Sequence, residues 1–236
     1  MIPKKIHLSW KDKDLLESKN ELVQLGVKQL AALNPDWEMV ISTDDEVDQY
    51  LSGKLQAEDY ALIAGCHIVQ KTDLWRLIKL HEEGGLYVDI DRFCNVRLDD
   101  LMDADTKWVL PTYRDVDFSH DFMMTAPGNP AFYAAVSLYL QRLKEGHRSV
   151  YFLGPQTYMH AVTLILTGEM VQPDPGIDKF NEIRGIIGES KFIKTFREDP
   201  PHETILYRNG DTALDLERLK REFYADSGLR HWTGEW

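Results

Sequence analysis

The sequence predicts a single α/β domain in which a mostly parallel central sheet is flanked by helices on both faces. Short apolar segments typical of strands alternate along the chain with longer segments whose apolar residues recur at helical spacing, which is the pattern of sheets covered by helices. The chain has 236 residues, a length that one α/β domain commonly reaches. It contains no evident linker, repeat or low-complexity tract, so we expect residues 1–236 to form one domain.

The first third of the chain predicts two strand–helix units followed by two further helices. Asn34-Pro35 ends the first helix, and Gly84-Gly85 ends the last one, because glycine favours helix C-termini. The expected elements are a strand at 5–9, a helix with Leu22, Leu25, Leu30 and Leu33 on one face, a strand at 37–42, a short acidic helix capped by Thr43 or Asp44, and helices at 57–65 and 69–83.

The remaining chain continues the alternation of strands and helices. Pro130 and Pro155 suit the first turn of a helix, where a missing N–H costs nothing. The expected elements are a strand at 84–91, strands at 108–110 and 121–126, helices at 130–143 and 154–166, a loop at 170–178, a strand at 203–208 and a polar helix at 214–224.

The strand at 84–91 carries the most informative pattern of the chain. Side chains alternate between the two faces of a strand, so Tyr87, Asp89 and Asp91 point away from its apolar residues. Burying two carboxylates side by side on an apolar strand costs free energy unless a cation lies between them. A divalent cation that also binds a diphosphate would meet this requirement. A strand that ends in a solvated turn is the alternative. Ligands of α/β sheets bind at this carboxyl edge.

Asp73 and Arg76 lie three residues apart on the preceding helix and therefore on one face. A surface ion pair would explain them and would contribute little. However, the residues around them are apolar on several faces, which indicates a buried helix, and buried charges require a partner or a function.

Composition and charge exclude several classes of function. The net charge of −12 opposes non-specific binding to nucleic acid and to anionic membranes. We expect no integral membrane segment, because no apolar run reaches the ~18–20 residues of a span; peripheral membrane association stays open. Cys66 and Cys94 have no disulfide or zinc spacing. The chain passes directly into its first strand without a signal peptide, which favours a cytoplasmic enzyme.

Several segments in this order resemble the DXD-motif sugar transferases of glycosyltransferase family 32, which include yeast-type initiating mannosyltransferases, bacterial capsule-type enzymes and, distantly, the glucosylating clostridial toxins. A lone Asp-x-Asp is not specific, whereas the ordered set spans the chain. The matching segments are Ile2-Pro3-Lys4-Lys5-Ile6-His7-Leu8-Ser9-Trp10, Thr72-Asp73-Leu74-Trp75-Arg76, Gly84-Gly85-Leu86-Tyr87-Val88-Asp89-Ile90-Asp91, Gly154-Pro155 and His231-Trp232-Thr233-Gly234-Glu235-Trp236.

The resemblance implies a GT-A-like fold and a metal-dependent hexosyltransferase that retains the anomeric configuration. It would move a sugar from a nucleotide-sugar donor to an acceptor hydroxyl in glycan or polysaccharide synthesis, with Mn²⁺ or Mg²⁺ as cofactor. A UDP-sugar is the expected donor and a GDP-sugar the alternative. The acceptor, glycan or protein, stays open. No residue stands out as a covalent nucleophile, which favours front-face attack by the acceptor.

The resemblance also assigns roles to residues. It implies that Asp91 is the direct metal ligand and that Asp89 contacts the ribose and sugar hydroxyls, and the ion through water. Asp73 and Arg76 would bind the transferred sugar. These four residues form the expected catalytic set.

Further residues complete the expected donor site. Trp10, after the first strand, would stack on the nucleotide base, although a core position is the alternative. Leu8 and Tyr87 belong to the same expected set. Where the family usually has an Asn before an apolar strand, this chain has His120 or Asp121, and this departure leaves the sugar preference open.

The aromatic C-terminus is unusual, because chain ends are normally polar. We expect residues 228–236 to fold over the donor as a lid. His231 would complete the metal shell or donate to the diphosphate, and Trp236 would donate its indole N–H to a phosphate. A tail that is merely docked on the core is the alternative.

Two other classes of function fit parts of the pattern. A nucleotidyltransferase can use a similar acidic metal site, but usually with a glycine-rich basic loop after the first strand, where this chain has Lys11-Asp12-Lys13-Asp14. A catalytically idle nucleotide-binding or scaffold protein would bind the donor without turnover.

Overall fold

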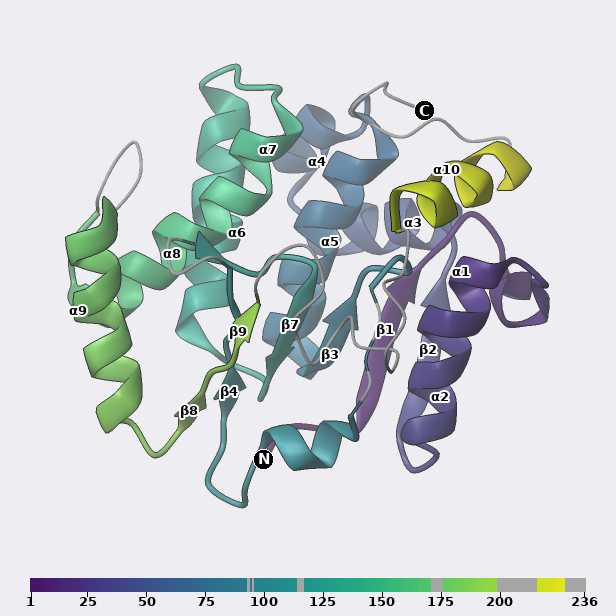
Figure 1. The fold of residues 1–236 in the computed structure, drawn as a ribbon. Helices are drawn as coiled ribbons and strands as arrows, with labels where there is room; N and C mark the ends of the chain where they lie inside the picture. Colours follow the sequence, from purple (N-terminus) through teal and green to yellow (C-terminus); the bar gives the residue numbers. More distant parts are fainter. Residues whose placement is uncertain (93, 95, 114–116, 171–175, 199–215, 228–236) are drawn as a thin grey trace.

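A six-stranded sheet organises the protein, with its strands in the order β2-β1-β3-β7-β4-β8 (Figure 1). The computed structural model describes residues 1–92, 94, 96–113, 117–170, 176–198 and 216–227. Strand β7 runs antiparallel to β3 and β4, whereas the other neighbouring strands of this sheet are parallel. The sheet is therefore mostly parallel, as the sequence predicts.

The strands of this sheet are short, and a second, three-stranded sheet with the order β6-β5-β9 lies beyond β4 along the chain. The strands of the first sheet are β1 Lys5–Ser9, β2 Glu38–Ser42, β3 Gly85–Val88, β4 Trp108–Val109, β7 Phe122–Thr125 and β8 Ile193–Lys194; those of the second are β5 Thr112–Tyr113, β6 Asp117–Phe118 and β9 Arg197–Glu198.

Helices cover both faces of the large sheet, which confirms the predicted fold class (Figure 1). None of the helices within the described residues is both long and apolar enough to span a membrane. One face carries η1 Lys13–Glu17, α1 Glu21–Val23, η2 Gln24–Lys28, α2 Gln29–Leu33, η3 Leu98–Leu101 and α10 Leu216–Ser227; the other carries α3 Asp44–Lys54, α4 Ala57–Ile63, α5 Ile68–Glu83, α6 Pro130–Lys144, α7 Val150–Leu153, α8 Pro155–Thr167 and α9 Gly176–Glu189.

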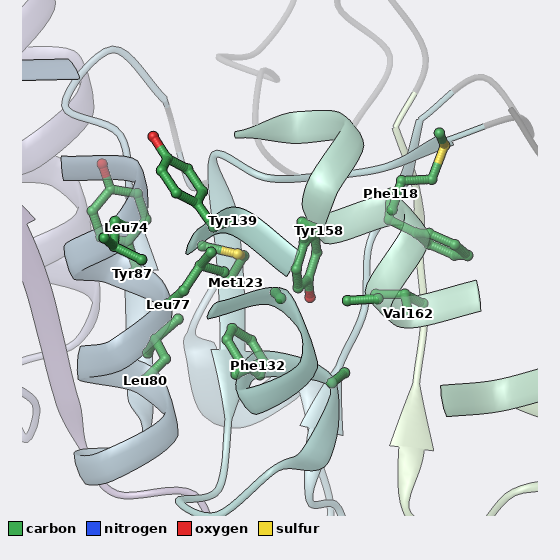
Figure 2. Packing of buried hydrophobic residues seen from close by; sticks show 14 of the residues in the cluster. Leu74, Leu77, Leu80, Tyr87, Phe118, Met123, Phe132, Tyr139, Tyr158 and Val162 are labelled. Atoms are coloured by element: carbon green, nitrogen blue, oxygen red, sulfur yellow. The ribbon is translucent and has the colours of Figure 1, made fainter. Parts of the chain in front are cut away.

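The alternation of side chains along β3 divides the core into two clusters. Leu86 and Val88 pack with the apolar residues of α1 and α2, whereas Tyr87 packs with those of α5, α6 and α8. Figure 2 shows the second cluster, in which Phe132 and Tyr158 lie beside Met123 of β7. Each fully buried side chain of this size contributes roughly 1.5–3 kcal/mol of transfer free energy, so both layers of helices are tied to the sheet.

The acidic strand is shorter than the sequence predicts. Strand β3 ends at Val88, and the N–H of Arg92 donates to the carbonyl of Asp89 at 3.0 Å, which closes a turn. The N–H of Asp89 bonds to the carbonyl of Asp121 at 2.9 Å. The predicted strand alternation through Asp91 is therefore wrong after Asp89, and the turn sets the position of Asp91.

The sequence also misassigns part of the second half of the chain. The expected loop at 170–178 is wrong at its end, because α9 begins at Gly176. This helix buries Phe180, Ile183 and Ile187, whose helical spacing is the signal that predicts it. The predicted strand at 203–208 lies outside the described residues. The predicted helix at 214–224 is present as α10, within a few residues of the expected bounds.

The backbones of β1 and β3 approach each other closely at Gly85, and substitution of this glycine tests that approach. Its φ is +97°, and a β-carbon there would lie 2.6 Å from the carbonyl oxygen of Lys5. We expect Gly85→Ala to lower the free energy of unfolding by about 1–3 kcal/mol for backbone strain and by about the same again for overpacking. Gly146→Ala is the control: its φ is +89° but its β-carbon meets open space, so only strain applies. Equal losses in chemical denaturation would contradict the close approach.

Candidate active site

A cleft of about 330 Å³ opens at the carboxyl ends of β1 and β3. This edge is where α/β sheets bind their ligands. Its walls come from the segments after β1 and β3, the start of α3, the first turns of α5, and α10. The lining residues are Ser9, Trp10, Lys11, Asp44, His67, Ile68, Val69, Thr72, Arg76, Tyr87, Asp89, Ile90, Asp91 and Tyr224.

Helix α5 starts at the cleft because a capping box defines its first residue. The Nδ1 atom of His67 accepts a hydrogen bond from the N–H of Val69 at 3.3 Å, and the side chain of Gln70 accepts from the N–H of His67 at 3.1 Å. The helix then buries nearly every side chain of its middle turns and ends at Gly84, whose φ is +67°. Ile68 and Val69 of its first turn line the cleft, so the positive end of the helix dipole lies beside it, which favours an anion there.

Arg76 lies at the floor of the cleft and is 5% exposed. Its Nη2 lies 2.7 Å from Oδ1 of Asp73, and its Nη1 lies 3.2 Å from Oδ1 of Asp89. Nη1 also donates to the carbonyl of His120 at 3.0 Å. The guanidinium carbon lies 4.2 Å from the centre of the Tyr87 ring, a cation–π contact. The pair that the sequence places on one helix face is therefore a buried ion pair, and the surface alternative is excluded.

Asp73 is more deeply buried than a sugar-binding role predicts. It is 2% exposed, and its Oδ2 has no hydrogen-bond partner among the described residues. Burial raises the pKa of its carboxyl to about 7, against the lowering effect of Arg76. In this conformation Asp73 is not among the described residues that line the cleft, and its carboxylate contacts the lining residue Arg76.

His120 lies next to Asp73, with Nδ1 3.9 Å from Oδ1 of the carboxylate. Burial and the nearby Arg76 hold the pKa of His120 well below its usual value, so the ring is neutral near pH 7. The carboxylate of Asp121 instead bonds Arg92 and the hydroxyl of Ser119. Of the two candidates for the position of the family Asn, His120 is therefore the one whose side chain faces Asp73.

Asp89 and Asp91 both line the cleft. The side chain of Asp89 is 33% exposed, and its Oδ1 accepts from the Tyr87 hydroxyl at 2.6 Å. Burial raises the pKa of Asp89, and Arg76 opposes this rise. Within the described residues, the structure contains no group of three or more His, Cys, Asp or Glu side chains that could hold a metal ion. Two carboxylates are present, which supply part of a coordination shell.

Trp10 follows β1 and lines the cleft. Its backbone N–H donates to the carbonyl of Ser42 at 3.0 Å. Its indole packs against Phe223 of α10 with ring centroids 4.8 Å apart. The next residue, Tyr224, faces the cleft. Sequence reasoning missed Tyr224, although two adjacent aromatic residues in a polar helix are a signal of a buried contact on one side.

Five of the predicted site residues line the cleft, and two more, Asp73 and His120, contact Arg76 without lining it. Trp10, Arg76, Tyr87, Asp89 and Asp91 line one cleft. In contrast, the Leu8 side chain is fully buried in the core, so its donor-binding role would have to use the backbone. His231, Trp236 and the expected lid at 228–236 lie outside the described residues.

Two further lining residues lie at the ends of strands that the sequence identifies. Asp44 comes two residues after the end of β2, and Ser9 is the last residue of β1, so both lie at the carboxyl edge where ligands bind. The hydroxyl of Ser9 lies 3.4 Å from that of Thr72 and joins β1 to α5. The first turn of α5 carried no such signal, because its lining residues are apolar or a single histidine.

Comparison with known families identifies a region that contains most of the lining residues of this cleft. Residues 20–108 match the family described as glycosyltransferase sugar-binding region containing DXD motif. The matched region includes α5, β3 and the pair Asp89 and Asp91, and it ends within β4.

Characterised relatives come from fungi. Inositol phosphoceramide mannosyltransferase 2 of Schizosaccharomyces pombe is 32% identical over 164 residues, which is 67% of this chain and 43% of the relative. Inositol phosphoceramide mannosyltransferase 1 of the same yeast is 27% identical over 138 residues, 57% of this chain and 42% of the relative. A mannosyl phosphorylinositol ceramide synthase of Saccharomyces cerevisiae is 27% identical over 58% of this chain and 34% of its own length. The chain thus spans less than half the length of these relatives.

The fold also has a solved counterpart. The structure of PaToxG glycosyltransferase superposes with a TM-score of 0.57 and 19% sequence identity, over 79% of this chain and 76% of that one. At this identity the likeness concerns the fold alone, and it agrees with the GT-A-like architecture that the sequence predicts. Residues 20–108 of the chain thus match the DXD-containing sugar-binding region of a family of glycosyltransferases.

Proposed function

We propose that this chain is a metal-dependent, retaining glycosyltransferase that moves a sugar from a nucleotide-sugar donor to an acceptor hydroxyl. One observation carries the proposal: the carboxylates of Asp89 and Asp91 line the same cleft as the Trp10 indole and the Arg76 guanidinium. A base-stacking surface, carboxylates that suit a divalent ion and a buried cation together fit the base and the diphosphate of a nucleotide-sugar donor.

The donor atoms available in the cleft fit a hard divalent cation. Asp91 and Asp89 offer carboxylate oxygens, which Mg²⁺ and Mn²⁺ prefer, and such ions usually complete their shell with substrate phosphates and water. Asp91 would be the direct ligand and Asp89 an indirect one, with His231 as a further candidate. Once bound, the ion supplies positive charge for the diphosphate that leaves in the reaction.

The residues of the chain would bind and orient the donor. The Trp10 indole would stack on the base. Asp89, with one oxygen held by Tyr87 and Arg76, presents its carboxylate to ribose and sugar hydroxyls. Arg76 is fixed by its neighbours before the donor binds, so its donors need little reorganisation when charge develops in the transition state. Asp73 would act chiefly by holding Arg76.

The proposal also names a nucleotide for the donor and candidate classes of acceptor. A UDP-sugar is the proposed donor, with a GDP-sugar as the alternative. Because the fungal relatives are named as mannosyltransferases acting on inositol phosphoceramide, mannose and a phosphoinositol-type acceptor belong among the candidates. Retention would follow front-face attack by the acceptor hydroxyl.

The structure offers an argument against the nucleotidyltransferase alternative. Lys13, in the basic and acidic segment after Trp10, donates to the carbonyl of Ile41 at 2.6 Å and pairs with Glu46. The Lys13 ammonium is therefore engaged by these partners, and Lys11 is the lysine of this segment that lines the cleft. A nucleotidyltransferase would usually direct a glycine-rich basic loop at the triphosphate, and this segment has no glycine.

A donor screen tests the proposal directly. The chain is incubated with UDP- and GDP-linked hexoses and Mn²⁺, and release of nucleoside diphosphate and free sugar is measured with and without acceptor; proton NMR then gives the anomer of the product. We expect release from one donor and retention. Nucleotide binding without release from any donor would favour the idle scaffold, and consumption of sugar phosphate with nucleoside triphosphate would favour the nucleotidyltransferase.

The metal assignment predicts a specific loss in Asp91→Asn. Asparagine keeps the shape but removes the charge, so Mn²⁺-enhanced nucleotide binding should disappear in calorimetry. Turnover should fall on the order of 10²–10³-fold, as when a preorganised electrostatic group is removed. Asp36→Asn is the control, because Asp36 is exposed and precedes β2 at the opposite edge of the sheet. Unchanged metal-enhanced binding in Asp91→Asn would exclude Asp91 as the ligand.

The stacking role predicts that Trp10→Ala weakens nucleotide affinity by about 1–3 kcal/mol. Calorimetry with the free nucleoside diphosphate measures this without a donor sugar. Trp37→Ala is the control: this buried tryptophan lies before β2, so it should lower stability and leave the affinity of the folded protein intact. A Trp10 variant that loses stability but binds the nucleotide normally would make Trp10 a core residue.

A further inference from the structure

Gly154, at the corner between α7 and α8, packs against the carboxylate of Asp73. A β-carbon on Gly154 would lie 2.4 Å from Oδ2 and 2.9 Å from Cγ of Asp73, and 3.2 Å from Cε1 of His120. Its φ is −85°, on the side that other residues adopt. Lack of space therefore requires glycine here, and a left-handed backbone does not.

We propose that Gly154 is a positioning residue: the absence of its side chain sets the place of the Asp73 carboxylate, and through it the place of the Arg76 guanidinium in the cleft. The effect on sugar transfer rests on the function proposed above. The steric relation between Gly154 and Asp73 stands independently of that function.

Arg142 of α6 holds the corner between α7 and α8 in place, so the corner does not shift freely to make room for a side chain at position 154. Arg142 is 4% exposed. Its Nη1 donates to the carbonyl of Phe152 at 2.8 Å and to the hydroxyl of Thr157 at 2.6 Å, so it bonds the chain on both sides of Gly154. The guanidinium carbon also lies 4.1 Å from the centre of the Phe152 ring. Moving the corner would break bonds to a buried charge, which is costly.

On the other side of the contact, the Asp73 carboxylate can move away from position 154 only by breaking its ion pair with Arg76. Its Oδ1 lies 2.7 Å from Nη2 of Arg76, and its Oδ2 is the atom that a side chain at 154 would meet. Because Oδ2 has no partner among the described residues, the contact with Gly154 is what fixes its side of the carboxylate. A methyl group at 154 would rotate the carboxylate away and leave Arg76 with one carboxylate fewer.

The first test compares Gly154→Ala with Gly185→Ala. Gly185 lies in α9, where a β-carbon meets open space and φ is not positive. Because alanine favours a helix interior over glycine by about 0.5–1 kcal/mol, this variant should be at least as stable as the wild type and equally active. Gly154→Ala should lower the melting temperature by about 2–10 °C, the range of an overpacked site in a chain of this size. Its kcat for transfer should fall on the order of 100-fold, as a misplacement of about 1 Å can cause. Affinity for the nucleoside diphosphate should stay within about twofold of the wild type, because a group that acts mainly in the transition state changes kcat more than binding.

A double-mutant cycle separates positioning from a general packing defect. In an Asp73→Ala background the clashing carboxylate is absent, so adding Gly154→Ala should cause no further fall in melting temperature. In an Asp73→Asn background the group keeps its size, so the fall should persist. Asp73→Ser replaces Asp73→Ala if that variant does not fold. Couplings of this kind between contacting residues are measurable.

Two stability results would overturn the proposal, in addition to the turnover result given below: an equal fall in melting temperature in the wild-type, Asp73→Ala and Asp73→Asn backgrounds, or a Gly154→Ala variant as stable as Gly185→Ala. Both of these results come from melting temperatures, so they do not depend on the proposed sugar transfer. If no donor is turned over but the stability cycle behaves as expected, the proposed function fails and the positioning role of Gly154 stands. If donor turnover is normal in Gly154→Ala, the positioning role fails and the proposed function stands.

Discussion

The buried guanidinium of Arg76 is the constraint on which the site depends. A charge in this position must be paired, and removing one partner of a buried pair typically costs about 3–5 kcal/mol. Arg76 meets this requirement with Asp73 from its own helix, Asp89 from the end of β3, the Tyr87 ring, and the carbonyl of His120 before β7. One side chain thereby ties α5, β3 and the approach to β7 together at the floor of the cleft.

The geometry of the chain explains why Arg76 and Asp89 meet. From Arg76 to the helix end at Gly84 the chain descends by about 12 Å at 1.5 Å per residue. From Gly85 to Asp89 it climbs back by about 13 Å at 3.3 Å per residue. The two side chains therefore reach the same height only if the turn is immediate, and the positive φ values of Gly84 and Gly85 provide it. The spacing between the two motifs follows from this requirement.

Much of this arrangement could be predicted from the sequence, and the exceptions have physical causes. Periodicity identifies the longer strands and the long helices other than α9, and the carboxyl-edge rule brings Trp10, Asp89 and Asp91 together. The position of Asp91 could not be predicted, because a turn at Asp89 ends the alternation. The burial of Asp73 depends on Gly154, 81 positions later in the sequence, and no local pattern records such a contact. The two-residue strands of the small sheet are too short to show a period. The single domain and the lid stay predictions.

The charges around the cleft bear on how an anionic donor could bind an acidic protein. Of the described side chains that line the cleft, Lys11 and Arg76 are cationic, whereas Asp44, Asp89 and Asp91 are acidic. Arg76 is already paired with two carboxylates, so its charge is largely balanced before a diphosphate arrives. The acidic pair at the end of β3 would then repel the donor unless a divalent cation came with it. In the proposed function the carboxylates therefore make donor binding depend on the metal. Arg76 contributes N–H donors of fixed orientation rather than net positive charge.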